Sequence, residues 1–251
     1  MLLHRKATVE KILNVHTSGD IEWLHRPSGR DRANLRAYQR ATTARCHSRL
    51  PELSGILTAL IGFAVIDKPA GLTSHACVAR IRRLLGIRRV GHGGTLDPAV
   101  TGVLPIAVGQ ATRLLPYLPG EKTYRGVIQL GITTSTDDLQ GVELSRAAVP
   151  VLCPEALDLA LDRFRGPISQ HPPQVSALHV NGERAHARAR RGEVMELPAR
   201  TVTIHQLHLL GWNAAGAQLS VEVHCSAGTY IRSLARDLGA SLGCGAVSYT
   251  H

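Results

Sequence analysis

A single carboxylate in a glycine- and proline-rich stretch is the group in this chain best suited to do chemistry. Residues 91–104 read GHGGTLDPAVTGVL, and the carboxylate is Asp97. Pro98 fixes its own φ and disfavours a helical conformation for Asp97. Loops shaped by glycine and proline often present a side chain to a ligand. Asp97 is therefore a candidate nucleophile or base, and the alternative is a structural turn in which it caps the next segment.

Four further stretches accompany this one. They are GFAVIDKPAGLTS at 62–74, EKTYRG at 121–126 running on to LGITTSTD at 130–137, PPQVSALHVNG at 172–182 and CSAGTYIRSLARDLG at 225–239. In this order, the five stretches resemble the motifs of TruB-type tRNA pseudouridine synthases. The resemblance extends over residues 62–246, about three quarters of the chain. It implies an isomerase that converts a T-loop uridine of tRNA to pseudouridine by base flipping.

The resemblance also assigns the catalytic residues. Asp97 is the nucleophile or base beside the glycosidic bond, Tyr124 stacks on the flipped base, and Arg232 pairs with Asp97. A carboxylate in a pocket that excludes water needs such a cation, because burial alone raises a carboxyl pKa. The alternative for Tyr124 is a cross-strand core tyrosine. Arg236, one helical turn after Arg232, is interpreted as an i, i+4 surface neighbour.

Five residues are candidates for substrate binding. By the resemblance, His92 lies against the displaced base, and its alternative role is to fix the loop. Lys68 supports the pocket or a phosphate. A loop over about 176–200 would grip RNA phosphates through Arg184, Arg188 and Arg191.

This loop over about 176–200, called the grip loop below, departs from the family pattern at two positions. His179 stands where the family usually has lysine, and His186 stands where it usually has tyrosine. Both departures bear on RNA contacts and leave the nucleophile unaffected.

The implied reaction needs neither a cofactor nor a metal, because uracil is detached, turned and reattached without redox change. The sequence agrees, since it holds no P-loop, dinucleotide fingerprint or clustered metal ligands. A phosphatase-like hydrolase would require a different context around Asp97. The acidic pair Asp137 and Asp138 is interpreted as turn residues.

Composition favours a polyanionic partner, and the alternative is that the charge reflects only an arginine-rich base composition. The 251 residues carry a formal charge of +10 and have a pI near 10.0, which suits tRNA. The five cysteines are scattered without a CxxC pair, as expected of a cytoplasmic protein. No apolar run is long enough for a membrane span. We expect a cytoplasmic monomer with no membrane association and no obligate protein partner.

Periodicity predicts the elements that position these residues. Strands are expected at 62–67, 124–134, 201–210 and 218–225, and helices at 154–164 and 230–238. A further helix is expected from Thr73 or Ser74 to Gly86, with its apolar face formed by Val78, Ile81, Leu84 and Leu85. The fold class is α+β, and the resemblance implies the pseudouridine-synthase fold, a mixed and largely antiparallel sheet with flanking helices.

The resemblance leaves both ends of the chain uncovered. Residues 1–60 are predicted to be a poorly ordered or non-native extension with a short helix over Lys6–Val15, or alternatively a basic RNA-binding arm. Residues 61–246 would form the catalytic domain. Residues 247–251 would be a tail foreign to the family, with its C-terminal RNA-binding domain absent. The alternative functions are therefore an inactive fragment and a non-catalytic tRNA-binding or folding module.

Overall fold

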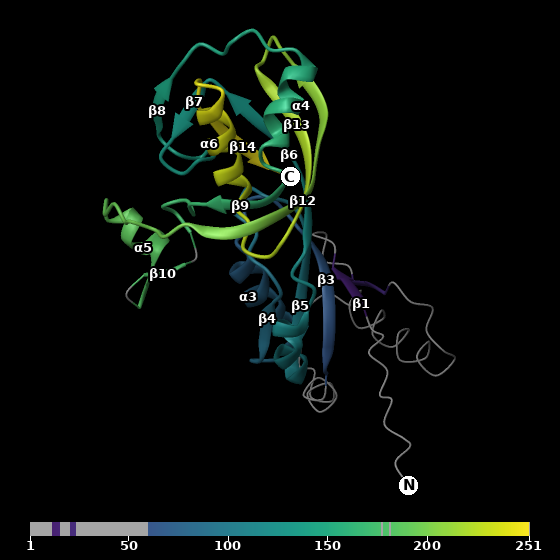
Figure 1. Ribbon diagram of the computed structural model, residues 1–251. Coiled ribbons are helices and arrows are strands. Elements are labelled where there is room, and N and C mark those ends of the chain that lie inside the picture. Colours follow the sequence, from purple (N-terminus) through teal and green to yellow (C-terminus); the bar gives the residue numbers. More distant parts are fainter. Residues whose placement is uncertain (1–11, 16–20, 24–59, 177, 181, 251) are drawn as a thin grey trace. The chain divides into compact units, whose positions relative to one another are not determined.

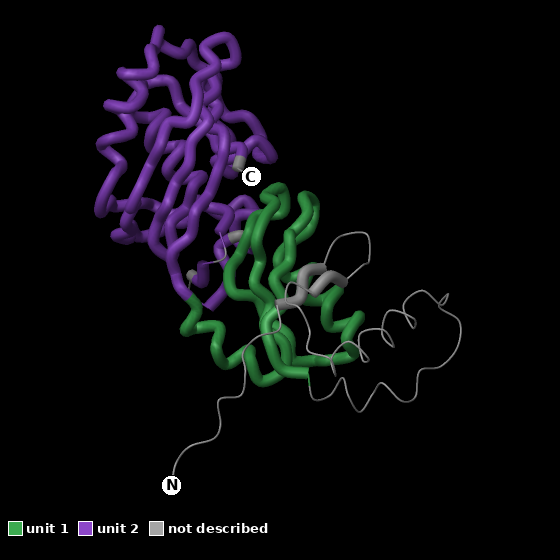
Figure 2. The backbone as a smooth tube through the Cα atoms, turned by 90° about the vertical axis from the view of Figure 1, so that its right-hand side faces the viewer, with its two compact units in different colours: residues 1–118 green, residues 119–251 purple. Residues whose placement is uncertain are grey.

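The chain forms two compact units, residues 1–118 and 119–251 (Figure 2). The computed structural model describes residues 12–15, 21–23, 60–176, 178–180 and 182–250. Each unit has a sheet and an apolar core of its own. The stretch predicted as a single domain, 61–246, therefore contributes to two cores.

Unit 1 is built on a five-stranded sheet of order β2-β1-β3-β5-β4 (Figure 1). Its strands are β1 Ile12–Val15, β2 Ile21–Trp23, β3 Gly62–Lys68, β4 Val90–His92 and β5 Gly102–Val108. β1 pairs in parallel with β3, and the other pairs are antiparallel. The helix predicted over Lys6–Val15 is wrong for Ile12–Val15, because these residues pair with a strand. The rest of that prediction lies outside the described residues.

Helix α3, Ser74–Leu85, covers the unit 1 sheet. The Thr73 side chain caps it by accepting a hydrogen bond from the Ala76 amide at 3.0 Å, and Gly86 ends it at φ +65°. Both predicted ends are confirmed. Of the predicted apolar face, Val78, Ile81 and Leu85 are buried, whereas Leu84 is 55% exposed. The 3₁₀ helix η1, Gly109–Tyr117, was not predicted.

Unit 2 is built on an antiparallel sheet of order β14-β6-β13-β12-β9. Its strands are β6 Lys122–Leu130, β9 Gly166–Gln170, β12 Arg200–Asn213, β13 Gln218–Cys225 and β14 Ala246–Thr250. The prediction of β13 is confirmed, because alternate residues of this strand are buried. The α+β class with largely antiparallel sheets is also confirmed.

Helices α4, Pro154–Asp162, and α6, Ile231–Ser241, pack against this sheet (Figure 1). Leu157 and Leu161 of α4 and Leu234 and Leu238 of α6 are fully buried. Burying each leucine contributes about 2 kcal/mol. The i, i+4 spacing of each pair explains why one face of each helix enters the core.

The predicted strand over 124–134 is two strands. β6 ends at Leu130, and β7, Ile132–Thr134, begins after Gly131 and pairs with β8, Glu143–Arg146. A tight turn follows β7. Asp137 and Asp138 lie in it, as predicted.

Strand β14 contains residues that the sequence analysis set outside the catalytic domain. Val247 lies opposite Gln129 of β6 and is fully buried, and Ser248 is also buried. Residues 247–250 therefore complete the unit 2 sheet.

The predicted RNA-gripping loop carries short elements of its own. They are β10 His179–Val180, β11 Glu183–Arg184 and the helix α5 Ala185–Arg190. Ala185, Met195 and Leu197 form a small core beneath them. Among the described residues, no helix is long and apolar enough to cross a membrane.

Candidate active site

Asp97 lies half-buried in the loop between β4 and β5. The residue before it is held by Ser74, the first residue of α3. The Leu96 amide donates to Ser74 Oγ at 2.9 Å, and the Ser74 hydroxyl donates to the Leu96 carbonyl at 3.4 Å. The Val100 amide donates to the Asp97 carbonyl at 3.0 Å and closes a turn. The loop therefore has a fixed position relative to α3.

Lys68 fixes the other side of the same loop. Its ammonium donates to the carbonyls of Pro69 at 2.9 Å, Leu72 at 2.7 Å and Pro98 at 3.1 Å. The side chain is fully buried, and burial lowers the pKa of the ammonium. The predicted contact with a phosphate is corrected, because all three protons are used inside the protein. Lys68 instead anchors the residue that follows Asp97.

His92 ends β4, five residues before Asp97. Its Nε2 lies 3.4 Å from Nδ1 of His75 in the first turn of α3, and the two rings meet edge to face at 4.9 Å. This contact orients the His92 ring. A contact between His92 and a displaced base stays a prediction.

Arg232 lies in the first turn of α6 in unit 2, with its side chain 8% exposed. Nη1 donates to the Thr136 carbonyl at 2.9 Å, and Nη2 donates to the Val175 carbonyl at 3.0 Å. The Asp138 carboxylate lies 3.9 Å from Nη1. Two separate segments therefore orient this guanidinium.

Tyr124 lies on β6, opposite Val223 of β13, and packs half-buried against the unit 2 core. This position suits both the predicted stacking role and the alternative core role. Tyr124 and Arg232 share one unit, and Asp97 belongs to the other.

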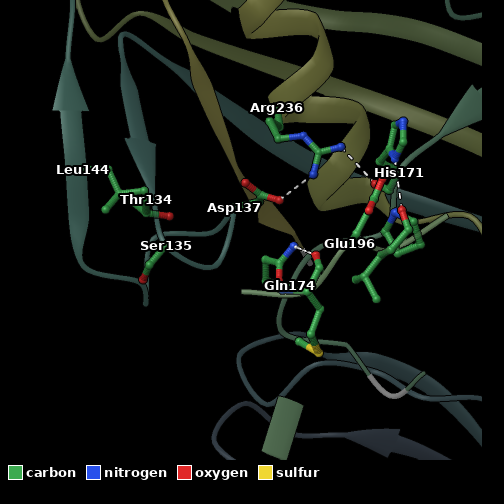
Figure 3. A pocket seen from close by; sticks show the side chains of 11 residues that line it. Thr134, Ser135, Asp137, Leu144, His171, Gln174, Glu196 and Arg236 are labelled. Carbon is green, nitrogen blue, oxygen red and sulfur yellow. Dashed lines mark hydrogen bonds and ion pairs between the residues drawn. The ribbon is translucent and has the colours of Figure 1, made fainter. Parts of the chain in front are cut away.

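Arg236 is not the surface neighbour that the sequence analysis expected. Its Nη1 lies 2.9 Å from the Asp137 carboxylate, and its Nη2 donates to the His171 carbonyl at 2.9 Å (Figure 3). Its Nε also pairs with Asp237 at 2.9 Å. Burial raises the pKa of Asp137, and Arg236 opposes that rise. Sequence reasoning missed this pair because its members are 99 residues apart.

A cavity of about 420 Å³ adjoins this ion pair within unit 2 (Figure 3). Gln174 shapes one wall, because its amide exchanges hydrogen bonds of 2.8 and 2.9 Å with the Met195 backbone. The lining combines charged, polar and apolar side chains from the β7–β8 hairpin, residues 171–174, residues 195–197 and α6.

Arg188 and Arg191, which are predicted to grip phosphates, pair with carboxylates. Arg188 lies 2.6 Å from Glu193, and Arg191 contacts both Glu183, at 2.5 Å, and Glu193, at 2.8 Å. Exposed pairs of this kind contribute about 0–1 kcal/mol, so a phosphate can compete for such arginines. Arg184 lies half-buried on β11.

Of the two histidines that depart from the family pattern, His179 is exposed on β10. The side chain of His186 lies outside the described part of the chain. The proposed effect of both histidines on RNA contacts stays a prediction.

Residues 82–231 match the family model described as TruB family pseudouridylate synthase (N terminal domain). The chain belongs to this family. The match includes Asp97 and Tyr124 and ends one residue before Arg232.

Relatives in the TruB family are highly similar to the chain. A tRNA pseudouridine synthase B of Synechococcus sp. (strain WH7803) is 78% identical over 189 residues, which are 75% of this chain and 63% of the relative. The protein of the same name from Parasynechococcus marenigrum (strain WH8102) is 73% identical over 73% of this chain and 63% of its own length. The chain thus spans less than two thirds of these relatives.

The fold is also similar to that of solved complexes. A chain in the crystal structure of a Cbf5-Nop10-Gar1 complex superimposes with a TM-score of 0.58 and 28% identity, over 81% of this chain and 53% of that chain. A chain in the structure of an H/ACA RNP bound to a substrate RNA containing 2'-deoxyuridine gives a TM-score of 0.54 and 27% identity. The match covers 81% of this chain and 52% of that chain. Both likenesses support the pseudouridine-synthase fold.

Proposed function

We propose that the chain is a tRNA pseudouridine synthase that isomerises a T-loop uridine, with Asp97 as nucleophile or base. The observation that carries this proposal is the clamped loop around Asp97. Ser74 holds the residue before the carboxylate, and Lys68 holds the residue after it. Membership of the TruB family and the names of its relatives support the reaction.

The reaction breaks the bond between uracil N1 and ribose C1′ and forms a bond from C5 to C1′. The proton originally on C5 leaves to a base, and N1, freed from the ribose, takes up a proton, so atoms and charge balance. Asp97 either attacks carbon or removes a proton, and both routes need an ionised carboxylate. A rigid loop favours either step, because it holds the carboxylate in a fixed position and saves the entropy of ordering it.

In this proposal, Arg232 and Tyr124 complete the site. Arg232 is a buried cation with an orientation fixed by two backbone carbonyls. Pairing with it would stabilise the negative charge that Asp97 needs in a site that excludes water. Tyr124 offers an aromatic face to the flipped uracil and a phenol beside the C5 proton.

In this proposal, tRNA is bound by the positive net charge of the chain and by the RNA-gripping loop over about 176–200. The formal charge of +10 attracts tRNA, and Arg184, Arg188 and Arg191 would contact its phosphates. His92 would lie in the space that the flipped base vacates. These contacts position the RNA without reading its sequence.

Release of tritium from tRNA labelled at uracil C5 tests the proposal. We expect release by the unmodified chain and by Asp67→Asn, a matched change at an exposed carboxylate on β3. Asp97→Asn should reduce release by at least about 10³-fold with little change in tRNA affinity, because the nucleophile alone is removed.

Release by Asp97→Asn at the unmodified rate would contradict the proposed nucleophile. Binding of tRNA without release by any variant would favour the non-catalytic binding module. In that case, the C-terminal segment of the Synechococcus sp. relative is fused to the chain. Release of tritium by the fusion alone would show that the unmodified chain is an inactive fragment and not a binding module.

A further inference from the structure

Two arginines one helical turn apart on α6 contact consecutive carboxylates of one turn. Arg232 lies 3.9 Å from Asp138, and Arg236 lies 2.9 Å from Asp137. The turn follows β7 and carries Thr136, whose carbonyl accepts from Arg232 at 2.9 Å. The turn at 136–138 therefore contacts Arg236 and also orients Arg232.

The same arginines also share a second segment. Arg232 donates to the Val175 carbonyl at 3.0 Å, and Arg236 donates to the His171 carbonyl at 2.9 Å. Residues 171–175 and the turn at 136–138 are joined twice through α6, once by each guanidinium. Arg236 therefore fixes the spacing of the two segments that hold Arg232.

The turn also holds an uncommon backbone conformation. Asp137 has φ +59°, which is uncommon for a residue with a side chain. Its carbonyl accepts from the Ser248 amide at 3.1 Å, and its carboxylate faces Arg236. Asp138 Oδ1 is occupied by the Thr136 hydroxyl at 2.6 Å and the Gln140 amide at 2.9 Å, which leaves Oδ2 toward Arg232.

We propose that the Asp137–Arg236 ion pair positions Arg232 for catalysis. This inference rests on the proposed function, in which Arg232 pairs with the catalytic carboxylate. Arg236 is a positioning residue, since it acts through the turn and through residues 171–175. A shift of about 1 Å in a catalytic group costs up to about 100-fold in rate, so a loosened turn should slow the chemical step.

The test compares Arg236→Met with Arg236→Lys and a matched control, Arg165→Met. Arg165 is equally buried, with its side chain 31% exposed against 29% for Arg236. It likewise pairs with two carboxylates, Asp158 and Asp162, and donates to one backbone carbonyl, that of Leu207. The control therefore removes a similar network elsewhere in unit 2.

Single-turnover rates and tRNA dissociation constants are measured for each variant of the full chain. We expect Arg236→Met to lower the single-turnover rate about tenfold or more and to change the dissociation constant less than about twofold. Arg236→Lys should recover part of the rate, because lysine retains one contact with Asp137. Arg165→Met should leave the rate within about twofold of the unmodified chain, even where its melting temperature falls.

A second readout is independent of activity. The NMR signal of the Arg232 Nε–H, assigned through its loss in Arg232→Gln, reports the environment of the guanidinium. It should shift or broaden in Arg236→Met and remain unchanged in Arg165→Met.

The two readouts separate this inference from the proposed function. If the unmodified chain forms no pseudouridine, the proposed function fails. The NMR signal of Arg232 then decides by itself whether Arg236 positions the Arg232 guanidinium. An unchanged Arg232 signal in Arg236→Met would overturn the inference. An unchanged rate in Arg236→Met, measured on an active unmodified chain, would overturn it as well.

Discussion

At the scale of single residues, Lys68 shows how a buried charged side chain fixes the shape of a loop. Its three protons satisfy three carbonyls, and one of these belongs to the residue after Asp97. A buried ammonium is stable only when it is bonded in this way. Its contribution is therefore to the shape of the loop.

Replacing Lys68 with methionine should lower the free energy of unfolding by about 2 kcal/mol or more. The methionine fills similar volume but leaves three carbonyls without their donor, and each such loss costs about 1–3 kcal/mol before relaxation. Urea denaturation measures the change. Lys122→Met, at a half-buried position on β6, serves as control and should change the free energy by less than about 0.5 kcal/mol. Equal losses in the two variants would contradict the role assigned to Lys68.

Motif spacing in the sequence singles out Asp97, Tyr124 and Arg232 as catalytic candidates, and their roles stay predictions. The clamp by Ser74 and the pair of Arg236 with Asp137 were missed. Each depends on two segments far apart in the chain, and no local pattern encodes that proximity.

At the scale of elements, α6 depends on close contact with the chain that leads into β14. A Cβ on Gly239 would lie 2.2 Å from the Ala246 amide nitrogen and 2.3 Å from the Gly245 carbonyl carbon. These are backbone atoms, so they cannot rotate away. Glycine is therefore required where α6 passes this segment.

We expect Gly239→Ala to lower the free energy of unfolding by about 3 kcal/mol, because the helix and β14 must separate. Gly211→Ala on β12 is the control, since a Cβ there would meet no atom within 4 Å. Thermal and urea unfolding of both variants measure the difference. A Gly239→Ala protein as stable as the control would show that α6 and β14 pack less closely than described.

Element prediction succeeded where the pattern was local. β13 alternates strictly, and α3 carries a cap and a terminating glycine, so both were found with correct type. The break between β6 and β7 was missed, because β-branched residues stand on both sides of Gly131. The strand β1 was missed because its pairing partner, β3, lies about fifty residues away in sequence.

At the scale of the whole molecule, the excess of basic side chains should make tRNA binding strongly salt-dependent. Ion pairs within the grip loop reduce this salt dependence. Arg188 and Arg191 hold the pKa of the Glu193 carboxyl below its usual range, and both form ion pairs with it. Binding of RNA phosphates by these arginines therefore competes with Glu193.

Glu193→Gln should consequently strengthen tRNA binding by about two- to fivefold at low salt, because two exposed ion pairs no longer compete. The slope of log affinity against log salt should steepen by up to about 1 for each arginine released to a phosphate. Glu143→Gln on β8 is the control, since it removes a similar exposed pair with Arg146 outside the grip loop. Equal affinities for the two variants at every salt concentration would argue against phosphate contacts by this loop.

The sequence by itself determined the family, the α+β class, the catalytic candidates and the ends of the regular elements with strong local patterns. It could do so because motifs, caps and periodicity depend on neighbouring residues. Only the tertiary structure decided that the chain divides into two units with separate apolar cores, that Lys68 is enclosed, and that Arg236 joins the turn that orients Arg232. These features depend on burial and on contacts between distant segments, and both arise only when the chain packs.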